Sequence, residues 1–160
     1  MTAEMSAQSE PDVLIRRATA DDVAGIVAMI ADDQLGATRE SADDLTPYLR
    51  AFEAIDADPN QVLVVADRDG ELIGTLQLTI IPGLSRHGSS RGLVEAVRVA
   101  ASARGSGLGT TLMEWAVQES RDRGCTLVQL TSDKARTDAH RFYTRLGFTN
   151  SHEGFKLKLS

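Results

Sequence analysis

The stretch "ARGSGLGTT" at residues 103–111 constrains the fold of this 160-residue chain more than any other. Its three glycines stand at alternate positions after Arg104, between a β-prone run at 91–100 and a helical segment at 107–123. A helix N-terminus carries unpaired N–H groups and a partial positive charge, and glycines let the backbone approach an anion closely. The pattern therefore predicts a phosphate-binding turn between a strand and a helix.

Apolar periodicity on both sides of this turn predicts a mixed α/β domain. Strands are expected at 13–18, 61–67, 71–81, 91–100, 125–132 and 152–160, and helices at 19–33, 41–55, 107–123 and 137–148. The "RDG" between the second and third strands predicts an antiparallel hairpin, and the order strand–helix–strand over 91–132 predicts a parallel pair. Residues 1–11 are expected to form a flexible tail, and residues 12–160 a single domain.

Composition excludes several classes of function. The net charge of −6 argues against a nucleic-acid-binding protein, which needs a basic surface. Cys125 is the one cysteine, so a disulfide within the chain and a cysteine-rich zinc site are excluded, and the spacing of the three histidines predicts no metal site. The sequence has neither a signal-peptide pattern nor an apolar run long enough for a membrane span, so we expect a cytoplasmic protein with no membrane partner.

The glycine spacing separates the phosphate ligands that such a turn could hold. A nucleoside-triphosphate loop needs a lysine after its last glycine, but no lysine lies between Arg104 and Lys134. The dinucleotide fingerprint G-x-G-x-x-G fails because Gly109 comes one residue early, although Asp133 at the end of the next strand keeps that alternative open. The preceding strand also contains Glu95 and is not continuously apolar.

A third pattern, R-x-x-G-x-G, is matched in full by Arg104, Gly107 and Gly109. The segment "AHRFYTRLGF" at 139–148 matches A-x-x-F-Y-x-x-x-G-F, and "VLIRRATADDVAGIVAMI" at 13–30 has the form of a first strand and helix. With these features the chain, from about residue 13, resembles the GNAT superfamily of acyl-CoA-dependent N-acetyltransferases. The resemblance implies a mostly antiparallel sheet with a parallel pair splayed at the cofactor cleft, and about four helices.

The resemblance also implies a donor site for acetyl-CoA. The strand before the loop would pair with the pantetheine arm, and the loop would hold the pyrophosphate. Arg136 stands where many members carry an asparagine, so either it contacts the cofactor or that contact is absent. The residues implied are Val97, Arg98, Val99, Arg104, Gly105, Ser106, Gly107, Leu108, Gly109, Thr110 and Arg136.

The implied reaction is direct attack of a primary amine on the thioester of acetyl-CoA. Tyr143 matches the signature tyrosine that protonates the leaving thiolate in many members. A phenol has a proton to give at neutral pH, because its ordinary pKa is about 10. The alternative is that Tyr143 only packs beside Phe142 on the apolar face of its helix.

Glu95 is the candidate general base or water-holding acid. It stands two residues before Val97 and is expected on the same side of the strand. The alternative is a structural ion pair with Arg98 or Arg16. The acceptor pocket is expected from residues 32–40 and 82–90, which carry no code for a particular amine. A homodimer, and an acyl-CoA-binding sensor or interaction module without turnover, are the options left open.

Overall fold

The computed structural model describes residues 13–32, 40 and 43–160. In chain order its elements are β1 (Val13–Arg17), η1 (Ala20–Asp22), α2 (Val23–Ala31), α3 (Thr46–Ala57), β2 (Gln61–Arg68), β3 (Glu71–Ile81), α4 (Ser85–Gly88), β4 (Ser90–Val99), η3 (Ala101–Ala103), α5 (Leu108–Asp122), β5 (Cys125–Leu130) and α6 (Thr137–Arg145). The predicted tail at 1–11 lies outside the described residues. None of the helices in the described ranges is long and apolar enough to cross a membrane.

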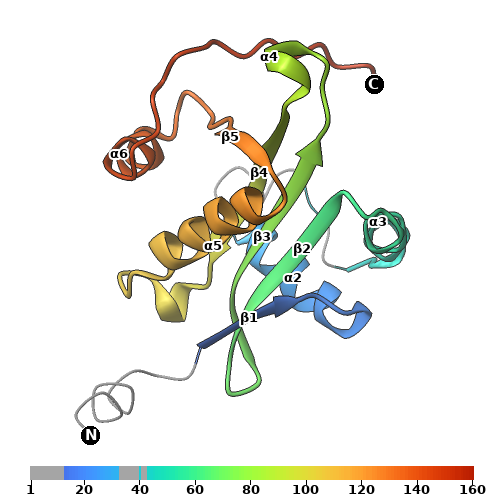
Figure 1. The fold of residues 1–160 in the computed structure, drawn as a ribbon. Coiled ribbons are helices and arrows are strands. Elements are labelled where there is room, and N and C mark those ends of the chain that lie inside the picture. Colours follow the sequence, from blue (N-terminus) through green and yellow to red (C-terminus); the bar gives the residue numbers. More distant parts are fainter. Residues whose placement is uncertain (1–12, 33–39, 41–42) are drawn as a thin grey trace, which may run out of the picture.

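The strands form one mixed sheet in the order β1-β2-β3-β4-β5 (Figure 1). The first four strands pair antiparallel, and β4 pairs with β5 in parallel, as the sequence predicts. Asp69 and Gly70 both have positive φ, 51° and 89°, which is the geometry of the two-residue turn that best matches strand twist. The parallel pair is joined by α5, because parallel strands need a crossover connection.

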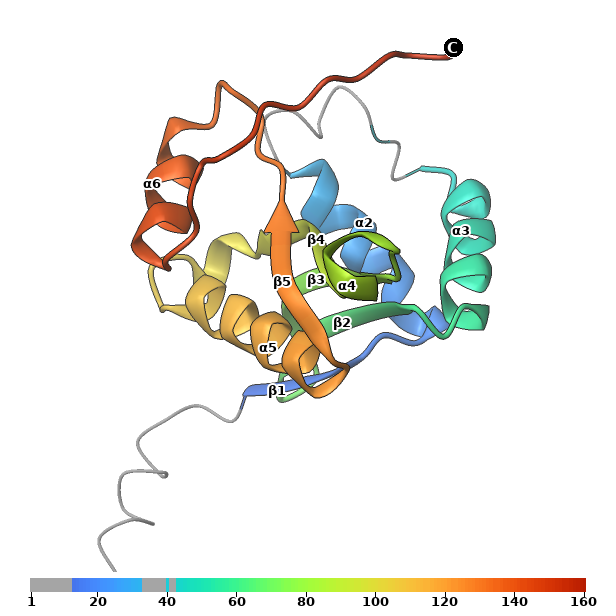
Figure 2. The same ribbon diagram turned by 45° about the horizontal axis from the view of Figure 1, so that its top comes forward.

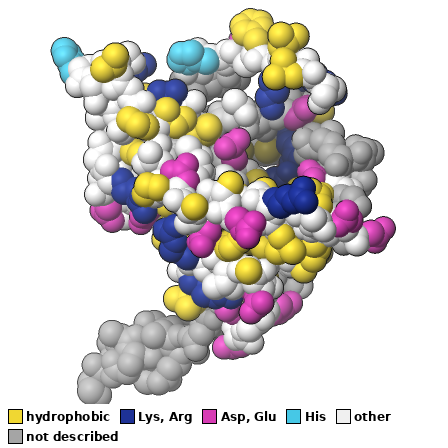
Figure 3. Space-filling model, turned by 90° about the vertical axis from the view of Figure 1, so that its right-hand side faces the viewer, with side chains coloured by type: hydrophobic (Ala, Val, Ile, Leu, Met, Phe, Trp, Pro, Cys, Tyr) yellow, Lys and Arg dark blue, Asp and Glu magenta, His cyan; other side chains and the backbone are white. Residues whose placement is uncertain are grey.

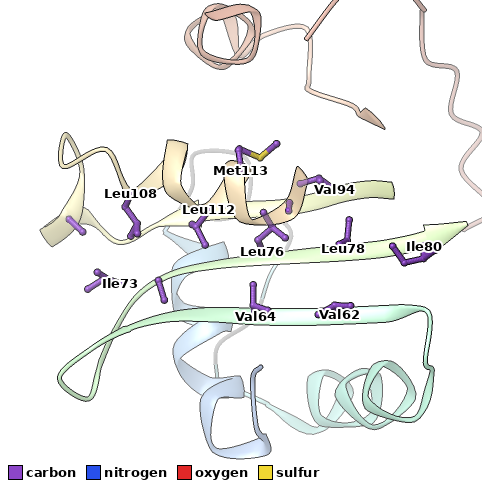
Figure 4. Packing of buried hydrophobic residues seen from close by; sticks show 13 residues of the cluster. Val62, Val64, Ile73, Leu76, Leu78, Ile80, Val94, Leu108, Leu112 and Met113 are labelled. Carbon is purple, nitrogen blue, oxygen red and sulfur yellow. The ribbon is translucent and has the colours of Figure 1, made fainter. Parts of the chain in front are cut away.

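Helices cover both faces of the sheet (Figure 2). One face packs against α5, where Leu112 and Met113 meet Leu76, Leu78 and Val94 in the main core (Figure 4). The other face packs against α2 and α3 through a smaller cluster around Val65, Ile26 and Phe52. The strand preceding the glycine loop is thus held between two layers of helix.

Glycines allow α5 to lie close to the sheet. A Cβ on Gly92 of β4 would come within 2.5 Å of the Ser120 Oγ, and one on Gly74 within 3.0 Å of both Leu108 and Leu112. Ser120 is buried, and its hydroxyl donates to the Ala116 carbonyl oxygen at 2.7 Å within the helix. The helix α5, which follows the glycine loop, therefore rests directly on β3 and β4.

Three predicted helices have different bounds in the structure. The segment 19–33 divides into η1 and α2. The Asp22 carboxylate accepts a hydrogen bond from the Thr19 N–H at 2.7 Å, and the two residues form a capping box there. The helix expected at 41–55 begins at Thr46, with Pro47 in its first turn, and the expected signal at Ser41 lies outside the described residues. The last helix ends at Arg145 rather than at 148.

The predicted strand at 152–160 is wrong. No regular structure follows α6, and Phe155, Leu157 and Leu159 are exposed. The segment alternates apolar and polar residues, but a strand forms only against a partner edge, and this segment runs along no other strand of its own chain. The loop expected at 82–90 instead contains the short turn α4, with Arg86 and His87 in the left-handed region.

Candidate functional site

A β-bulge interrupts β4 just before its end. Gln77 of β3 stands opposite Glu95, but Thr75 stands opposite Arg98, so β4 contains one extra residue between these pairs. Ala96 in this bulge has a φ of 54°, a backbone conformation that residues other than glycine rarely adopt. Such strain is found mainly where the surrounding structure enforces it, often at functional sites.

The bulge corrects the prediction that Glu95 and Val97 share one side of the strand. The register puts Glu95 and Arg98 on the face of Thr75 and Gln77, because those two residues are two apart on β3. Val97 lies toward the core with α5, whereas Glu95 is exposed. The extra residue thus reverses the alternation of side chains within β4. As a result, Glu95 and Val97 lie on opposite faces of the strand that precedes the glycine loop.

Beside the bulge, β4 and β5 separate. Their parallel pairing runs only from Ser90 opposite Cys125 to Val94 opposite Leu130. From Glu95 to Val99, β4 remains paired with β3 on one side while its edge toward β5 is open. An open strand edge offers backbone N–H and C=O groups to an extended ligand. Within this edge the Val97 carbonyl oxygen accepts a hydrogen bond from the Arg98 guanidinium at 2.9 Å.

The glycine loop begins where this open edge ends. After η3, Gly105 and Gly107 have φ of 81° and 84°, and Gly107 is the N-cap of α5. A Cβ on either glycine would meet no atom within 4 Å, so these positions require glycine for their dihedral angles and not for space. No side chain in the described part of the chain caps α5, so its first N–H groups are available to an anion.

Gly109 has a different role from the two glycines before it. It lies inside α5, and a Cβ there would come 3.4 Å from the Phe142 ring of α6. This is an ordinary van der Waals distance, so the space beside Gly109 would accept a Cβ. Ser106, Leu108 and Thr110 continue the loop and the start of the helix, with Leu108 buried in the core.

A cavity of about 340 Å³ joins these parts of the chain. It is lined by Met29, Asp32, Val97, Arg98, Val99, Arg104 and Arg136. Five of the seven are residues that the sequence predicts for the cofactor, and three of those are arginines. The Arg104 guanidinium lies 3.3 Å from the Asp32 carboxylate, but both side chains are more than half exposed, so this ion pair contributes little stability.

Tyr143 of α6 lies near the same arginines. Burial raises the pKa of its phenol, and the positive charges of Arg98 and Arg136 act in the opposite direction. Its ring packs edge-to-face against Phe142 at 5.1 Å and Phe148 at 5.9 Å between centroids. The phenol is therefore partly buried, protonated at neutral pH and oriented by two aromatic neighbours.

Glu95 is exposed and lies on a polar part of the sheet. Beside its cross-strand neighbour Gln77, a polar ladder crosses to β2, in which Gln77 Nε2 and Thr79 Oγ1 both donate to Gln61 Oε1, at 2.8 and 3.0 Å. The predicted alternative partner Arg16 instead donates to Asp22 and Asp67, at 2.7 and 3.1 Å. Arg16 is thus engaged at the β1 edge of the sheet.

Cys125 and His140 have structural surroundings. Cys125 is half-buried at the start of β5, packs against the main core, and has its thiol pKa raised by burial. His140 pairs through Nε2 with the Asp133 carbonyl oxygen at 2.9 Å. Within the described residues no group of histidine, cysteine and acidic side chains could hold a metal ion. The face shown in Figure 3 mixes acidic and basic side chains without a continuous basic surface.

Two features of the site were missed at the sequence level. Met29 at the end of α2 lines the cavity, although nothing in the local sequence marks it. Asp32 also lines it and belongs to the segment 32–40 that was expected for the acceptor pocket, of which residues 33–39 lie outside the described residues. The bulge at Ala96 also lacks a signal, because the sequence "EAV" contains no glycine. Both depend on long-range packing, namely α2 against the sheet and β4 against β3.

Comparison with known proteins gives the family. The model of the acetyltransferase (GNAT) family matches residues 26–148. An aminoalkylphosphonate N-acetyltransferase of Salmonella typhimurium is 32% identical over 141 residues, which are 88% of each chain. A glucosamine 6-phosphate N-acetyltransferase of Trypanosoma brucei brucei is 36% identical over 56% of this chain and 59% of that protein.

A solved structure agrees with the fold. The crystal structure of a transcriptional regulator from Bacillus halodurans C-125 is 46% identical and superimposes with a TM-score of 0.90 over 92% of this chain and all of that one. The arrangement of the sheet and helices is thus a known architecture. The chain belongs to the GNAT family of acyl-CoA-dependent acetyltransferases.

Proposed function

We propose that this protein transfers the acetyl group of acetyl-CoA to the primary amine of a small molecule or a protein. The observation that carries the proposal is the open edge of β4 from Glu95 to Val99, which leads directly into the glycine loop. An extended pantetheine arm can pair with such an edge as an additional strand would. Val97, Arg98 and Val99 supply that pairing in this proposal.

The diphosphate of the donor would lie at the start of α5. Gly105 and Gly107 expose backbone N–H groups there, and the helix dipole favours an anion. Arg104 and Arg136, which line the same cavity, add positive charge. Many members of the family carry an asparagine at the position of Arg136. In this proposal the arginine contacts the phosphates of the cofactor instead.

The chemistry needs three groups around the thioester. The amine loses a proton as it attacks the carbonyl carbon, and we assign this proton to Glu95, directly or through a water molecule. The carbonyl oxygen gains charge and accepts a hydrogen bond from a backbone N–H at or next to Val99. As the C–S bond breaks, Tyr143 donates its proton to the sulfur, so the products are an amide and free CoA thiol.

The phenol is suited to this role by its surroundings. Burial raises the pKa of Tyr143, so the proton stays on the oxygen through neutral pH. Arg98 and Arg136 stabilise the phenolate that forms after the proton has left, because they lower the same pKa.

For the acceptor, we propose a small primary amine that also carries a phosphonate or phosphate group. Two relatives are named for such acceptors, an aminoalkylphosphonate and glucosamine 6-phosphate. Glu95 and the neighbouring polar ladder would receive the amine end. The first amine to assay is therefore 2-aminoethylphosphonate, and the panel also includes amines that lack phosphorus.

The test is release of CoA thiol from acetyl-CoA with this panel of amines, repeated with Tyr143→Phe. The variant keeps the ring against Phe142 and Phe148 but removes the proton, so kcat should fall by about 10²- to 10⁴-fold. Stabilisation by acetyl-CoA in a thermal melt should be unchanged, which separates catalysis from binding. Glu95→Gln should lower the rate most at the pH where the wild type is fastest.

Failure would have a recognisable form. If acetyl-CoA raises the melting temperature but no amine is acetylated faster than the thioester hydrolyses, an acyl-CoA-responsive binding module is the better description. The name of the Bacillus halodurans relative, a transcriptional regulator, makes this the second candidate.

A further inference from the structure

Three arginines line the cavity, and the proposed donor site uses the side chains of two of them for the diphosphate. Arg104 and Arg136 have that role, whereas Arg98 pairs with the pantetheine arm through its backbone. The side chain of Arg98 nevertheless lines the cavity, together with Met29 of α2. A guanidinium in a cavity is suited to bind the oxygens of a phosphonate, phosphate or carboxylate, because its planar fork matches them.

The bulge in β4 places Arg98 on the same face of the strand as Glu95. The cross-strand partners of these two residues, Thr75 and Gln77, are two positions apart on β3. Residues two apart on a strand share a face and lie roughly 7 Å apart. In a regular strand, residues as far apart in sequence as Glu95 and Arg98 would lie on opposite faces. The extra residue therefore brings the proposed base and this guanidinium to one side of the sheet.

The two charged groups are neighbours on this face but do not pair with each other. Among the described residues no ion pair joins the Glu95 carboxylate to Arg98. Arg98 Nη1 instead donates to the Val97 carbonyl oxygen at 2.9 Å, which holds the guanidinium beside the open edge of β4. A carboxylate and a guanidinium in this arrangement are complementary to a small zwitterion with a cationic and an anionic end.

β4 carries a second arginine on the same face. Arg91 stands opposite Ile81 of β3 and precedes Glu95 by four residues. The cavity lies on the other side of Glu95, where its lining from β4 begins at Val97. A ligand that extends from Glu95 into the cavity would therefore meet Arg98 and not Arg91.

We propose that Arg98 binds an anionic group of the acceptor while Glu95 receives its amine, so that preferred acceptors carry an anion two carbon atoms from a primary amine. The inference rests on the proposed function and adds the residue that selects the acceptor. Such a molecule is shorter than the separation of the two residues along the strand, which leaves room for a hydrogen bond at each end. A phosphonate should be preferred over a sulfonate or a carboxylate, because it carries more negative charge.

Four acceptors of one length test the inference. They are 2-aminoethylphosphonate, taurine, β-alanine and propylamine, which differ only in the group two carbon atoms from the amine. The wild type should have its highest kcat/KM with the phosphonate and its lowest with propylamine. Arg98→Gln should lower kcat/KM for the phosphonate roughly 10- to 100-fold more than for propylamine, which is the range for a hydrogen bond to a charged group.

The comparison between acceptors is necessary because Arg98 also acts on Tyr143. Its positive charge lowers the pKa of the phenol, so its loss should alter turnover with every amine. Only the ratio of kcat/KM between the phosphonate and propylamine reports on recognition of the anion. Arg98→Lys keeps the charge but loses the fork, so it should retain part of that ratio.

Arg91→Gln is the matched control. It removes an arginine from the same face of β4 and should leave the ratio as in the wild type. Acetyl-CoA should still raise the melting temperature of all three variants, because the open edge of β4 offers the donor backbone groups. This rise also shows that the variants are folded.

Three results would overturn the inference while the proposed acetyl transfer stands. They are equal kcat/KM for all four amines in the wild type, a preference that Arg98→Gln leaves intact, and a preference that Arg91→Gln abolishes. If no amine is acetylated, the proposed function fails, and calorimetric titration with 2-aminoethylphosphonate in the presence of CoA decides the inference separately. Binding that Arg98→Gln abolishes would support it, and no binding, or equal binding to both proteins, would overturn it.

Discussion

The helices α5 and α6 both carry residues that the sequence assigns to the site, yet they are held in different ways. α5 buries Leu108, Leu112, Met113, Ala116 and Ser120, whereas α6 buries no residue completely. The first carries the phosphate loop at its N-terminus, and the second carries Tyr143. The proposed donor-binding part of the site is thus fixed to the core, while the proposed acid lies on a helix whose apolar face is only partly covered.

The difference shows that site residues need not share the stability of the fold. Local stability follows the burial of apolar contacts, so α6 is expected to open at lower free energy than α5. Binding of the donor across both helices would couple them.

The largest effect should come from Leu112→Ala. The side chain is fully buried between α5 and the sheet, so its loss leaves a cavity and should lower the free energy of unfolding by about 2–5 kcal/mol. Leu146→Ala, after α6, should cost clearly less because that side chain is already partly exposed. Urea unfolding of both variants measures the difference, and equal losses would contradict the contrast between the helices.

A smaller effect is expected from Gly107→Ala. The φ of 84° costs a residue with a Cβ roughly 1 kcal/mol, although space is available. The variant should also bind acetyl-CoA more weakly, because the first N–H groups of α5 would shift.

Gly109→Ala is the matched control. Gly109 is helical, and its new Cβ would lie at ordinary contact distances from the Phe142 ring, at 3.4 Å, and from Val99, at 4.0 Å, so the change should leave the start of α5 in place. Calorimetric titration with acetyl-CoA compares the two. If Gly109→Ala weakened binding as much as Gly107→Ala, the different roles of these glycines would be wrong.

The smallest change in stability near neutral pH is expected from Asp22, which lies at the start of α2. The Arg16 guanidinium holds the pKa of this carboxyl below its usual range, and the Thr19 N–H adds to the effect. Because the folded-state pKa is lowered, the charge stabilises the protein above the unfolded pKa of about 4. Stability should therefore be constant from pH 7 to 5 and fall as the pH drops further.

Asp22→Asn checks this assignment. The variant should be less stable at pH 7 and should lose less stability on acidification than the wild type, as thermal melts across pH would show. The affinity for acetyl-CoA at pH 7 should not change. An identical pH profile in wild type and variant would remove Asp22 from this role.

Much of this architecture could be predicted from local patterns. Strands at 61–67 and 71–81, the turn between them and the helix at 107–123 all lie within two residues of β2, β3 and α5. These elements have strong periodicity and glycines at their ends. The predicted residues Val97, Arg98, Val99, Arg104 and Arg136 also meet at one cavity.

The errors share a physical cause. Alternation at 152–160 specifies which side chains share a face, but it does not specify which edge, or which molecule, the strand will meet. The side assigned to Glu95 was wrong because the bulge is fixed by pairing with β3, and Ala96 gives no local sign of it. Long-range pairing decided both.

The bulge at Ala96 also has a consequence for protein engineering. Glycine would occupy its left-handed conformation without strain, so a screen for thermal stability should favour Ala96→Gly. The same substitution would loosen the backbone between Glu95 and Val97, which are the proposed base and a proposed donor-pairing residue. A stabilised library and an active library should therefore diverge at this single position.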